Sequence, residues 1–112
     1  MLSLKGLKEM QRLFSAPSFI GHLKMTSAIF GVPRFKIVAA LCRFEEGLTV
    51  TEIAEIMQAP ISRISHQLAI LRHAGLVRRR RRNREAIYAL DKRQIARAHE
   101  TLHSMFRWTG DR

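Results

Sequence analysis

The segment 49–75 carries two helical patterns separated by a very short break, and this arrangement is the strongest constraint on the fold. Thr49 and Glu52 have the spacing of a capping box, in which a threonine hydroxyl and a glutamate carboxylate satisfy free N–H groups at a helix start. We therefore expect a short helix whose inward side chains are Val50, Ile53, Ala54 and Met57. A brief turn at Gln58 and Ala59 follows, and Pro60 is expected to start a second helix.

The second helix of this pair has an apolar stripe at three- and four-residue steps, which is typical of one buried helical face. The stripe consists of Ile61, Ile64, Leu68 and Leu71. Gly75 follows where a helix commonly ends in the left-handed conformation. If the stripe is buried, the side chains that face outward near the helix start are Ser62, Arg63, Ser65, His66 and Gln67.

After Gly75 the pattern changes to that of strands, which are predicted at 76–82 and 85–90 around a tight turn at Asn83 and Arg84. Further helices are predicted at 3–15, from a cap at Ser18 to Phe30, from Pro33 to about Glu46, and after a cap at Asp91. Their apolar faces include Leu4, Leu7, Phe14, Phe19, Leu23, Ile37, Val38, Leu41, Ile95, Ala98, Leu102, Met105 and Phe106. The predicted fold class is mainly α with a two-stranded β-wing, a winged helix-turn-helix in a single domain spanning 1–112.

The charge of the chain is strongly unbalanced, with 20 Lys and Arg against 9 Asp and Glu and a net charge of +11. No acidic residue lies between Glu55 and Glu85, whereas eight arginines do. Because patterned apolar sequence flanks this block, a folded basic surface is favoured over a disordered tail. Such a surface fits a polyanion, either nucleic acid or an acidic membrane.

Several function classes lack support in the sequence. It has no glycine-rich phosphate loop and no nucleophile–base motif, so we expect neither an enzyme nor a cofactor. The single cysteine, Cys42, cannot form an internal disulfide, and no apolar run reaches the roughly 18 to 20 residues of a membrane span. The expectation is a soluble, cytoplasmic protein without a membrane partner.

The second helix of the pair has the side chains that major-groove recognition needs, since Arg pairs with guanine, Gln with adenine, and hydroxyls hold phosphates. Arginines of the hairpin are expected on the DNA backbone or in a minor groove. The predicted contacts to double-stranded DNA are Ser62, Arg63, Ser65, His66, Gln67, Arg72, Arg78, Arg80, Arg82 and Arg84.

Three stretches carry a resemblance to a known family: Leu48-Thr-Val-Thr-Glu-Ile-Ala, Ile64-Ser-His-Gln-Leu and Leu71-Arg-His-Ala-Gly-Leu-Val. With Gly31-Val-Pro-Arg34 upstream, they resemble the ArsR/SmtB regulators. The resemblance implies a homodimer, with dimerisation helices in 1–30 and 91–108, the helix-turn-helix in 49–74 and the wing in 76–90. Intramolecular packing of the first and last helices is the alternative.

The sequence lacks the metal ligands that this resemblance would supply. Thr49-Val50-Thr51 replaces a C-V-C motif, and a threonine hydroxyl cannot replace a thiolate as a soft ligand. His99 and His103 stand four residues apart on one helical face, which suits either a metal or an ordinary surface. Cys42 is interpreted as a small buried hydrophobe, with a redox role as the alternative.

The leading hypothesis is a sequence-specific transcriptional repressor that binds double-stranded DNA as a homodimer and responds to an unidentified effector, if to any. A nonspecific architectural DNA-binding protein is the alternative, because arginine contacts to phosphate carry no sequence information. An RNA accessory ranks last, since the polar-tipped aromatics Tyr88 and Trp108 lie outside the arginine block.

Overall fold

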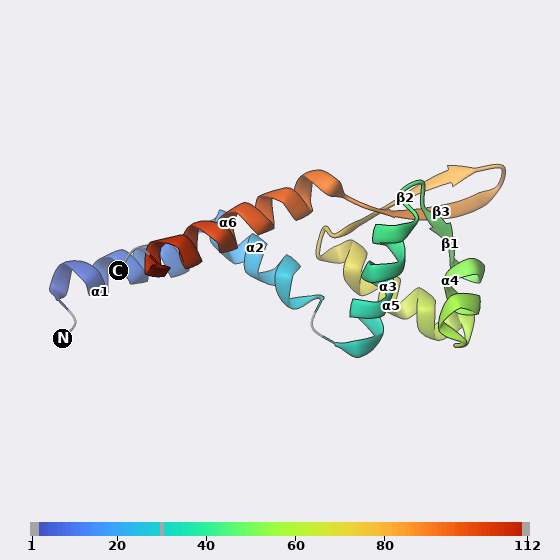
Figure 1. The fold of residues 1–112 in the computed structure, drawn as a ribbon, viewed down its shortest axis with the longest axis horizontal. Helices are drawn as coiled ribbons and strands as arrows, with labels where there is room; N and C mark the ends of the chain where they lie inside the picture. The colour runs from blue at the N-terminus through green and yellow to red at the C-terminus, as the bar shows by residue number, and fades with distance from the viewer. Residues whose placement is uncertain (1–2, 30, 111–112) are drawn as a thin grey trace.

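The computed structural model describes residues 3–29 and 31–110. Their elements in chain order are α1 (Leu4–Ser15), α2 (Pro17–Ser27), α3 (Val32–Arg43), β1 (Leu48–Thr49), α4 (Val50–Met57), α5 (Ile61–His73), β2 (Val77–Arg82), β3 (Glu85–Leu90) and α6 (Lys92–Gly110). The predicted winged helix-turn-helix is confirmed, with α4 and α5 as the helix pair and β2 and β3 as the wing (Figure 1).

The molecule is long, with principal extents of 56 × 23 × 22 Å. A rounded body contains α3, α4, α5 and the sheet, and an arm made of α1, α2 and α6 extends from it (Figure 1). Within the arm, α2 packs against α6 and α1 packs against α2. The DNA-binding elements of a winged helix are therefore held in the body, away from the far end of the arm.

The sheet has three antiparallel strands in the order β1-β3-β2. Sequence analysis missed β1, which is only two residues long and pairs Leu48 with Tyr88 and Thr49 with Ile87. In the wing, β2 and β3 are joined by Asn83 and Arg84, whose φ angles are 50° and 72°. Positive φ at both positions is what a two-residue hairpin turn requires, and here no glycine supplies it.

The core lies where the helices of the body meet the sheet. Its least exposed large side chains come from α3, α4, α5 and the strands or their flanks: Ile37, Leu41, Ile53, Ile64, Leu68, Leu71, Leu76 and Ile87. No described residue with a polar or charged side chain is buried. The body is thus held together by apolar contact, which contributes about 25 cal/mol for each Å² removed from water.

Local signals in the sequence set the starts of α4 and α6 as predicted. The Thr49 hydroxyl accepts from the Glu52 amide at 3.1 Å, and the Glu52 carboxylate accepts from the Thr49 amide at 2.8 Å, so the capping box is confirmed. Asp91 accepts from the Gln94 amide at 3.2 Å at the start of α6.

The end of α5 leads directly into the wing through a Schellman motif. Gly75 has φ 86° and donates to the Arg72 carbonyl at 3.0 Å. The next amide, that of Leu76, donates to the Leu71 carbonyl, also at 3.0 Å. The Leu76 carbonyl then accepts from the Asp91 amide at 2.8 Å, so one residue joins α5, the wing and the approach to α6.

Three helix predictions are wrong in detail. α2 begins at Pro17 and not after Ser18, because Pro fits the first helical position. α3 ends at Arg43 and not near Glu46, because the chain turns at Gly47, with φ 102°, to enter β1. Ile61, predicted to be buried, is 53% exposed, because the first turn of α5 projects beyond the core.

Cys42 is also exposed and not a buried hydrophobe, since it lies one position past the inward-facing Leu41 on α3. The predictions for Phe30 and for the side chains of Met105, Phe106 and Trp108 lie outside the residues that the structure describes.

Across the described residues, no single helix has the length and apolar character to cross a membrane; α2 and α3, taken together as a bent pair, match a span by length and composition only.

Gly47 is expected to tolerate no side chain. A Cβ there would lie 2.5 Å from Cγ2 of Ile87 and 2.8 Å from the Tyr88 carbonyl oxygen, at a φ of 102°. Gly47→Ala should therefore lower the free energy of unfolding by about 2–4 kcal/mol, measured by urea denaturation.

Gly21→Ala is the matched control, because a Cβ at this position in α2 meets nothing within 4 Å. It should raise the stability by about 0.5–1 kcal/mol through helix propensity. Equal effects of the two substitutions would contradict the close approach at Gly47.

Candidate nucleic-acid interface

The rotation of α5 decides which of its side chains reach the surface. Ile64, Leu68 and Leu71 are at most 1% exposed, so that face is fixed against the core. The opposite face has its predicted outward residues Ser62, Arg63, Ser65 and His66, all exposed. Arg72 is exposed as well, near the other end of the helix. α5 thus presents a polar surface whose first turns contain hydroxyls, a guanidinium and an imidazole.

The start of α5 differs from that of α4 in its capping. α4 begins with the Thr49–Glu52 capping box, which places a carboxylate at its positive end. α5 begins after Pro60, without a side-chain cap and without an acidic residue in its first turn. A helix N-terminus of this kind favours an anion, because partial positive charge and free N–H groups gather there. The arrangement suits a phosphate beside α5.

Gln67 stands apart from the other outward residues of α5. It is only half-exposed, and its Oε1 accepts from Nη1 of Arg34 on α3 at 3.1 Å. The Nε of the same Arg34 donates to the Ala28 carbonyl at 2.7 Å. A bidentate contact from Gln67 to adenine would need Oε1, so this bond would have to be released first. Here Gln67 ties α5 to α3 and to the end of α2.

The arginines of the wing alternate between the two faces of the hairpin. The register pairs Arg79 with Tyr88 and Arg81 with Ala86, so these two share the face that also carries Leu48 of β1. Arg78, Arg80 and Arg82 lie on the other face, opposite Ala89, Ile87 and Glu85. The wing therefore presents cations in two directions.

Acidic residues lie beside the base of the wing and opposite its tip. A hollow beside the wing is lined by Glu45 and Glu46 together with Arg78, Arg79 and Arg80. The Arg80 guanidinium donates to the Glu46 carbonyl at 3.3 Å, and Arg82 faces Glu85 across the hairpin.

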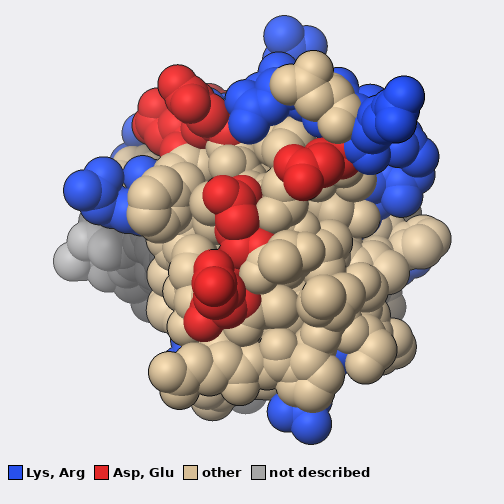
Figure 2. All heavy atoms as spheres, turned by 90° about the vertical axis from the view of Figure 1, so that its right-hand side faces the viewer, with Lys and Arg blue, Asp and Glu red and all other residues tan. Residues whose placement is uncertain are grey.

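Arg79 and Arg81 share their face with apolar and aromatic cross-strand partners, and Arg81 donates to the Arg84 carbonyl at 3.1 Å. Figure 2 looks onto the wing end and shows Lys and Arg gathered at the top and upper right, with Asp and Glu below and beside them.

Sequence analysis chose Arg78, Arg80, Arg82 and Arg84 and missed Arg79 and Arg81. Strand alternation alone divides the run into two sets, which was a usable signal. It could not show that Glu45 and Glu46 lie beside the wing, because they come from a loop more than 30 residues upstream of it.

Comparison of the sequence with known proteins points to one family. The family model of bacterial regulatory proteins of the arsR family matches residues 33–79, which contain α4 and α5. A protein of Halobacterium salinarum named as an arsenical resistance operon repressor is 33% identical over 78 residues, 70% of this chain. Over this region the chain is similar to the ArsR family. It spans 60% of the length of that relative.

Solved structures of the same family share the fold. An ArsR-like transcriptional regulator from Rhodococcus sp. RHA1 superposes with a TM-score of 0.76 at 18% identity, covering 86% of this chain and 89% of that one. A homodimeric winged helix-turn-helix DNA-binding domain from Mycobacterium bovis superposes with a TM-score of 0.62 at 22% identity, covering 81% and 79%. At these identities the likeness concerns the fold.

The histidine pair lies on the surface of α6. The rings of His99 and His103 stack with centroids 6.0 Å apart and an interplanar angle of 9°. In the part of the chain that the structure describes, no group of three or more His, Cys, Asp or Glu side chains is placed to hold a metal ion. Binding of a metal by these two histidines therefore stays an untested prediction.

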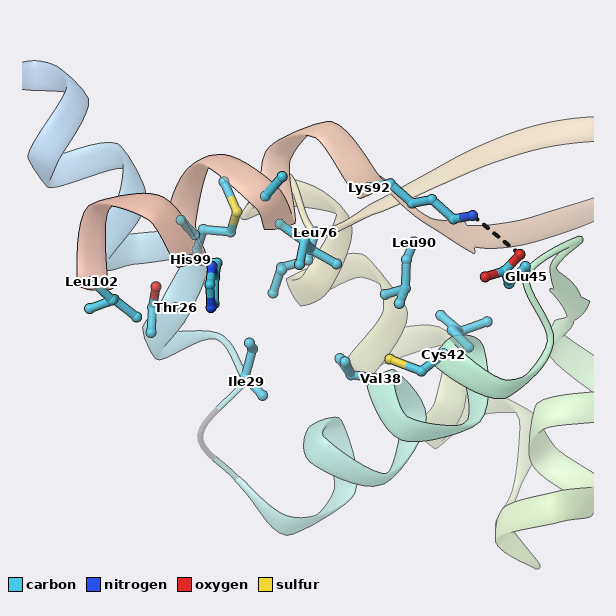
Figure 3. A pocket seen from close by; sticks show the side chains of 15 residues that line it. Thr26, Ile29, Val38, Cys42, Glu45, Leu76, Leu90, Lys92, His99 and Leu102 are labelled. Atoms are coloured by element: carbon cyan, nitrogen blue, oxygen red, sulfur yellow. Dashed lines mark ion pairs between the residues drawn. The ribbon is translucent and has the colours of Figure 1, made fainter. Parts of the chain in front are cut away.

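An apolar pocket of about 480 Å³ lies where α2, α3 and α6 meet the base of the wing. Figure 3 shows Thr26, His99 and Leu102 at one end and the Lys92–Glu45 ion pair, at 3.3 Å, at the other. Cys42 lines the pocket with its sulfur turned toward Val38. None of the predicted DNA-contact residues is among those that line it.

The two faces of the wing are expected to differ in their contribution to DNA binding. The double substitution R79Q/R81Q should reduce the slope of log K against log salt by about 1.8 per protomer, because each lost phosphate contact removes about 0.9. The pair R80Q/R82Q should reduce it less, because Arg80 donates to the Glu46 carbonyl and Arg82 is the cross-strand partner of the acidic Glu85. Fluorescence anisotropy across a salt series measures both slopes, and a larger reduction from R80Q/R82Q would reverse the assignment of the faces.

Proposed function

We propose that this chain is a sequence-specific DNA-binding transcriptional regulator that acts as a homodimer and represses its target genes. The observation that carries the proposal is the exposed, acid-free first half of α5, with hydrogen-bonding side chains beside an arginine-rich wing. The H. salinarum relative named as an operon repressor supports repression as the outcome of binding.

α5 enters the major groove with its N-terminal half in this proposal. Burial of Ile64 and Leu68 orients Arg63 and His66 outward, where they reach base edges. Arg63 is the proposed reader of guanine, because its guanidinium fits O6 and N7 in a bidentate manner. Ser62 and Ser65 hold phosphates on either side, and the wing contacts the adjacent backbone.

The homodimer is proposed because the arm leaves a stripe of apolar side chains largely exposed, although Phe14 of this stripe stacks on Phe19. No residue of α1 is buried, and Leu4, Leu7, Met10 and Phe14 are 67%, 40%, 38% and 57% exposed. Leu23 on α2 is 44% exposed, beside the seam with α6. An apolar stripe of this extent is more typical of an interface than of a monomer surface. The M. bovis domain with this fold is itself homodimeric.

A nonspecific architectural DNA-binding protein is the second candidate, and the arginine wing is what favours it. Phosphate contacts alone give affinity without sequence preference. The two candidates differ in whether α5 side chains discriminate among base pairs, which a binding experiment decides.

Selection from a random duplex library by the full chain is expected to yield a preferred palindromic sequence, bound about 10³-fold or more tightly than random duplex near physiological salt. Arg63→Ala should then cost about 1–3 kcal/mol of discrimination at one base pair in each half-site, measured by competition binding. Arg12→Ala, in α1, is the control, because it removes a cation outside the proposed DNA interface of α5 and the wing. If no sequence is enriched and binding falls steeply with salt, the architectural function replaces the proposed one.

The homodimer is expected to depend on α1. The double substitution Leu7→Lys and Phe14→Lys places charge in the exposed stripe, so sedimentation equilibrium should show a shift from dimer toward monomer. Ile56→Lys is the control, because Ile56 on α4 is also an exposed apolar side chain, at 51%. It should leave the dimer intact. A dimer that withstands the α1 substitutions would place the interface elsewhere.

A further inference from the structure

Ile61 is exposed at the position where α5 begins. It continues the helical spacing of Ile64, Leu68 and Leu71, yet it is 53% exposed while they are at most 1% exposed. At its N-terminus, α5 extends one turn beyond the core. The side chain therefore projects from the end of α5 that the proposed function places deepest in the major groove.

Folding does not account for an isoleucine at this position. The side chain gains little burial there, and a β-branched residue has a poorer helix propensity than most unbranched residues. The N-cap position of α5 is occupied by Pro60, so Ile61 has no capping role. Single exposed apolar side chains are ordinary on protein surfaces, as Ile56 on α4 illustrates. What distinguishes Ile61 is its place among the base-reading candidates.

The neighbours of Ile61 on this surface are polar. Ser62, Arg63, Ser65 and His66 are all exposed and can all form hydrogen bonds. Ile61 is four residues before Ser65, so the two share one side of the helix. The exposed first turns of α5 thus combine several hydrogen-bonding groups with one apolar side chain at the tip.

The major groove contains one apolar group on its base edges, the C5-methyl of thymine. An aliphatic side chain that enters this groove is stabilised by removing apolar surface from water, and on the base edges the thymine methyl is the apolar group it can pack against. We propose that Ile61 is a specificity-determining residue that packs on the C5-methyl of one thymine in each half-site. The inference rests on the proposed function, since it requires α5 to lie in the major groove.

The test removes the methyl group and nothing else from the DNA. Deoxyuridine keeps the hydrogen-bonding edge of thymine and lacks its methyl, so each thymine of the selected duplex is replaced in turn by deoxyuridine. At one position in each half-site, wild-type affinity should fall about fourfold, the effect of one buried methyl, and about 16-fold when both half-sites are changed.

Ile61→Ala changes both protomers, so it should bind the thymine duplex as weakly as the wild type binds the duplex with deoxyuridine in both half-sites. It should show no further loss of affinity on deoxyuridine. Ile61→Val, which keeps part of the contact, should give an intermediate ratio. Ile56→Ala removes similar apolar area from an exposed isoleucine on α4 and should keep the full wild-type ratio. Circular dichroism of each variant checks that the fold is retained.

The outcomes separate the inference from the proposed function. If a preferred duplex emerges but deoxyuridine has no effect at any position, or Ile61→Ala keeps the wild-type ratio, the thymine contact is wrong while sequence-specific binding stands. If no preferred duplex emerges at all, the proposed function fails, and the contact fails with it.

Discussion

Burial of one face of α5 is the interaction on which the rest of this structure depends. Ile64, Leu68 and Leu71 pack into the centre of the body and leave almost no surface in water. Their burial fixes the rotation of the helix about its own axis, and that rotation selects the side chains that point outward. Because packed interiors tolerate little change in volume, the setting is rigid. The polar surface of α5 is in this sense a product of its apolar face.

Local signals made most of the fold predictable from the sequence. The Thr49–Glu52 capping box, Gly75 and the Asp91 cap each act through atoms a few residues apart, so a short window of sequence contains all the relevant chemistry. The helical period likewise predicted which face of α5 is buried. It could not show where the core ends along the helix axis, which is why Ile61 was placed inside. That limit is set by neighbouring elements.

The site was less predictable wherever distant segments meet. The Arg34–Gln67 hydrogen bond joins α3 to α5 across 33 positions of sequence, and no local pattern encodes it. The loop containing Glu45 and Glu46 lies beside the wing, where the Arg80 guanidinium donates to the Glu46 carbonyl across 34 positions of sequence. β1 is a two-residue strand that exists through its pairing with β3. In each case the residue types were visible in the sequence but their partners were not.

The junction at Leu76 has a consequence for how this protein can change over time. The Leu76 amide donates to the Leu71 carbonyl at the end of α5, and the Leu76 carbonyl accepts from the amide of Asp91, which caps α6. Both bonds are made by main-chain atoms. Nearly every amino acid supplies the same amide and carbonyl, and only proline lacks the donor. The hydrogen bonds of this link therefore do not depend on side-chain chemistry, although the Leu76 side chain is itself buried in the core, so the exposed side chains of α5 and α6 are the ones free to diverge. The exposed surface of either helix could change in a lineage without disturbing the joint between them.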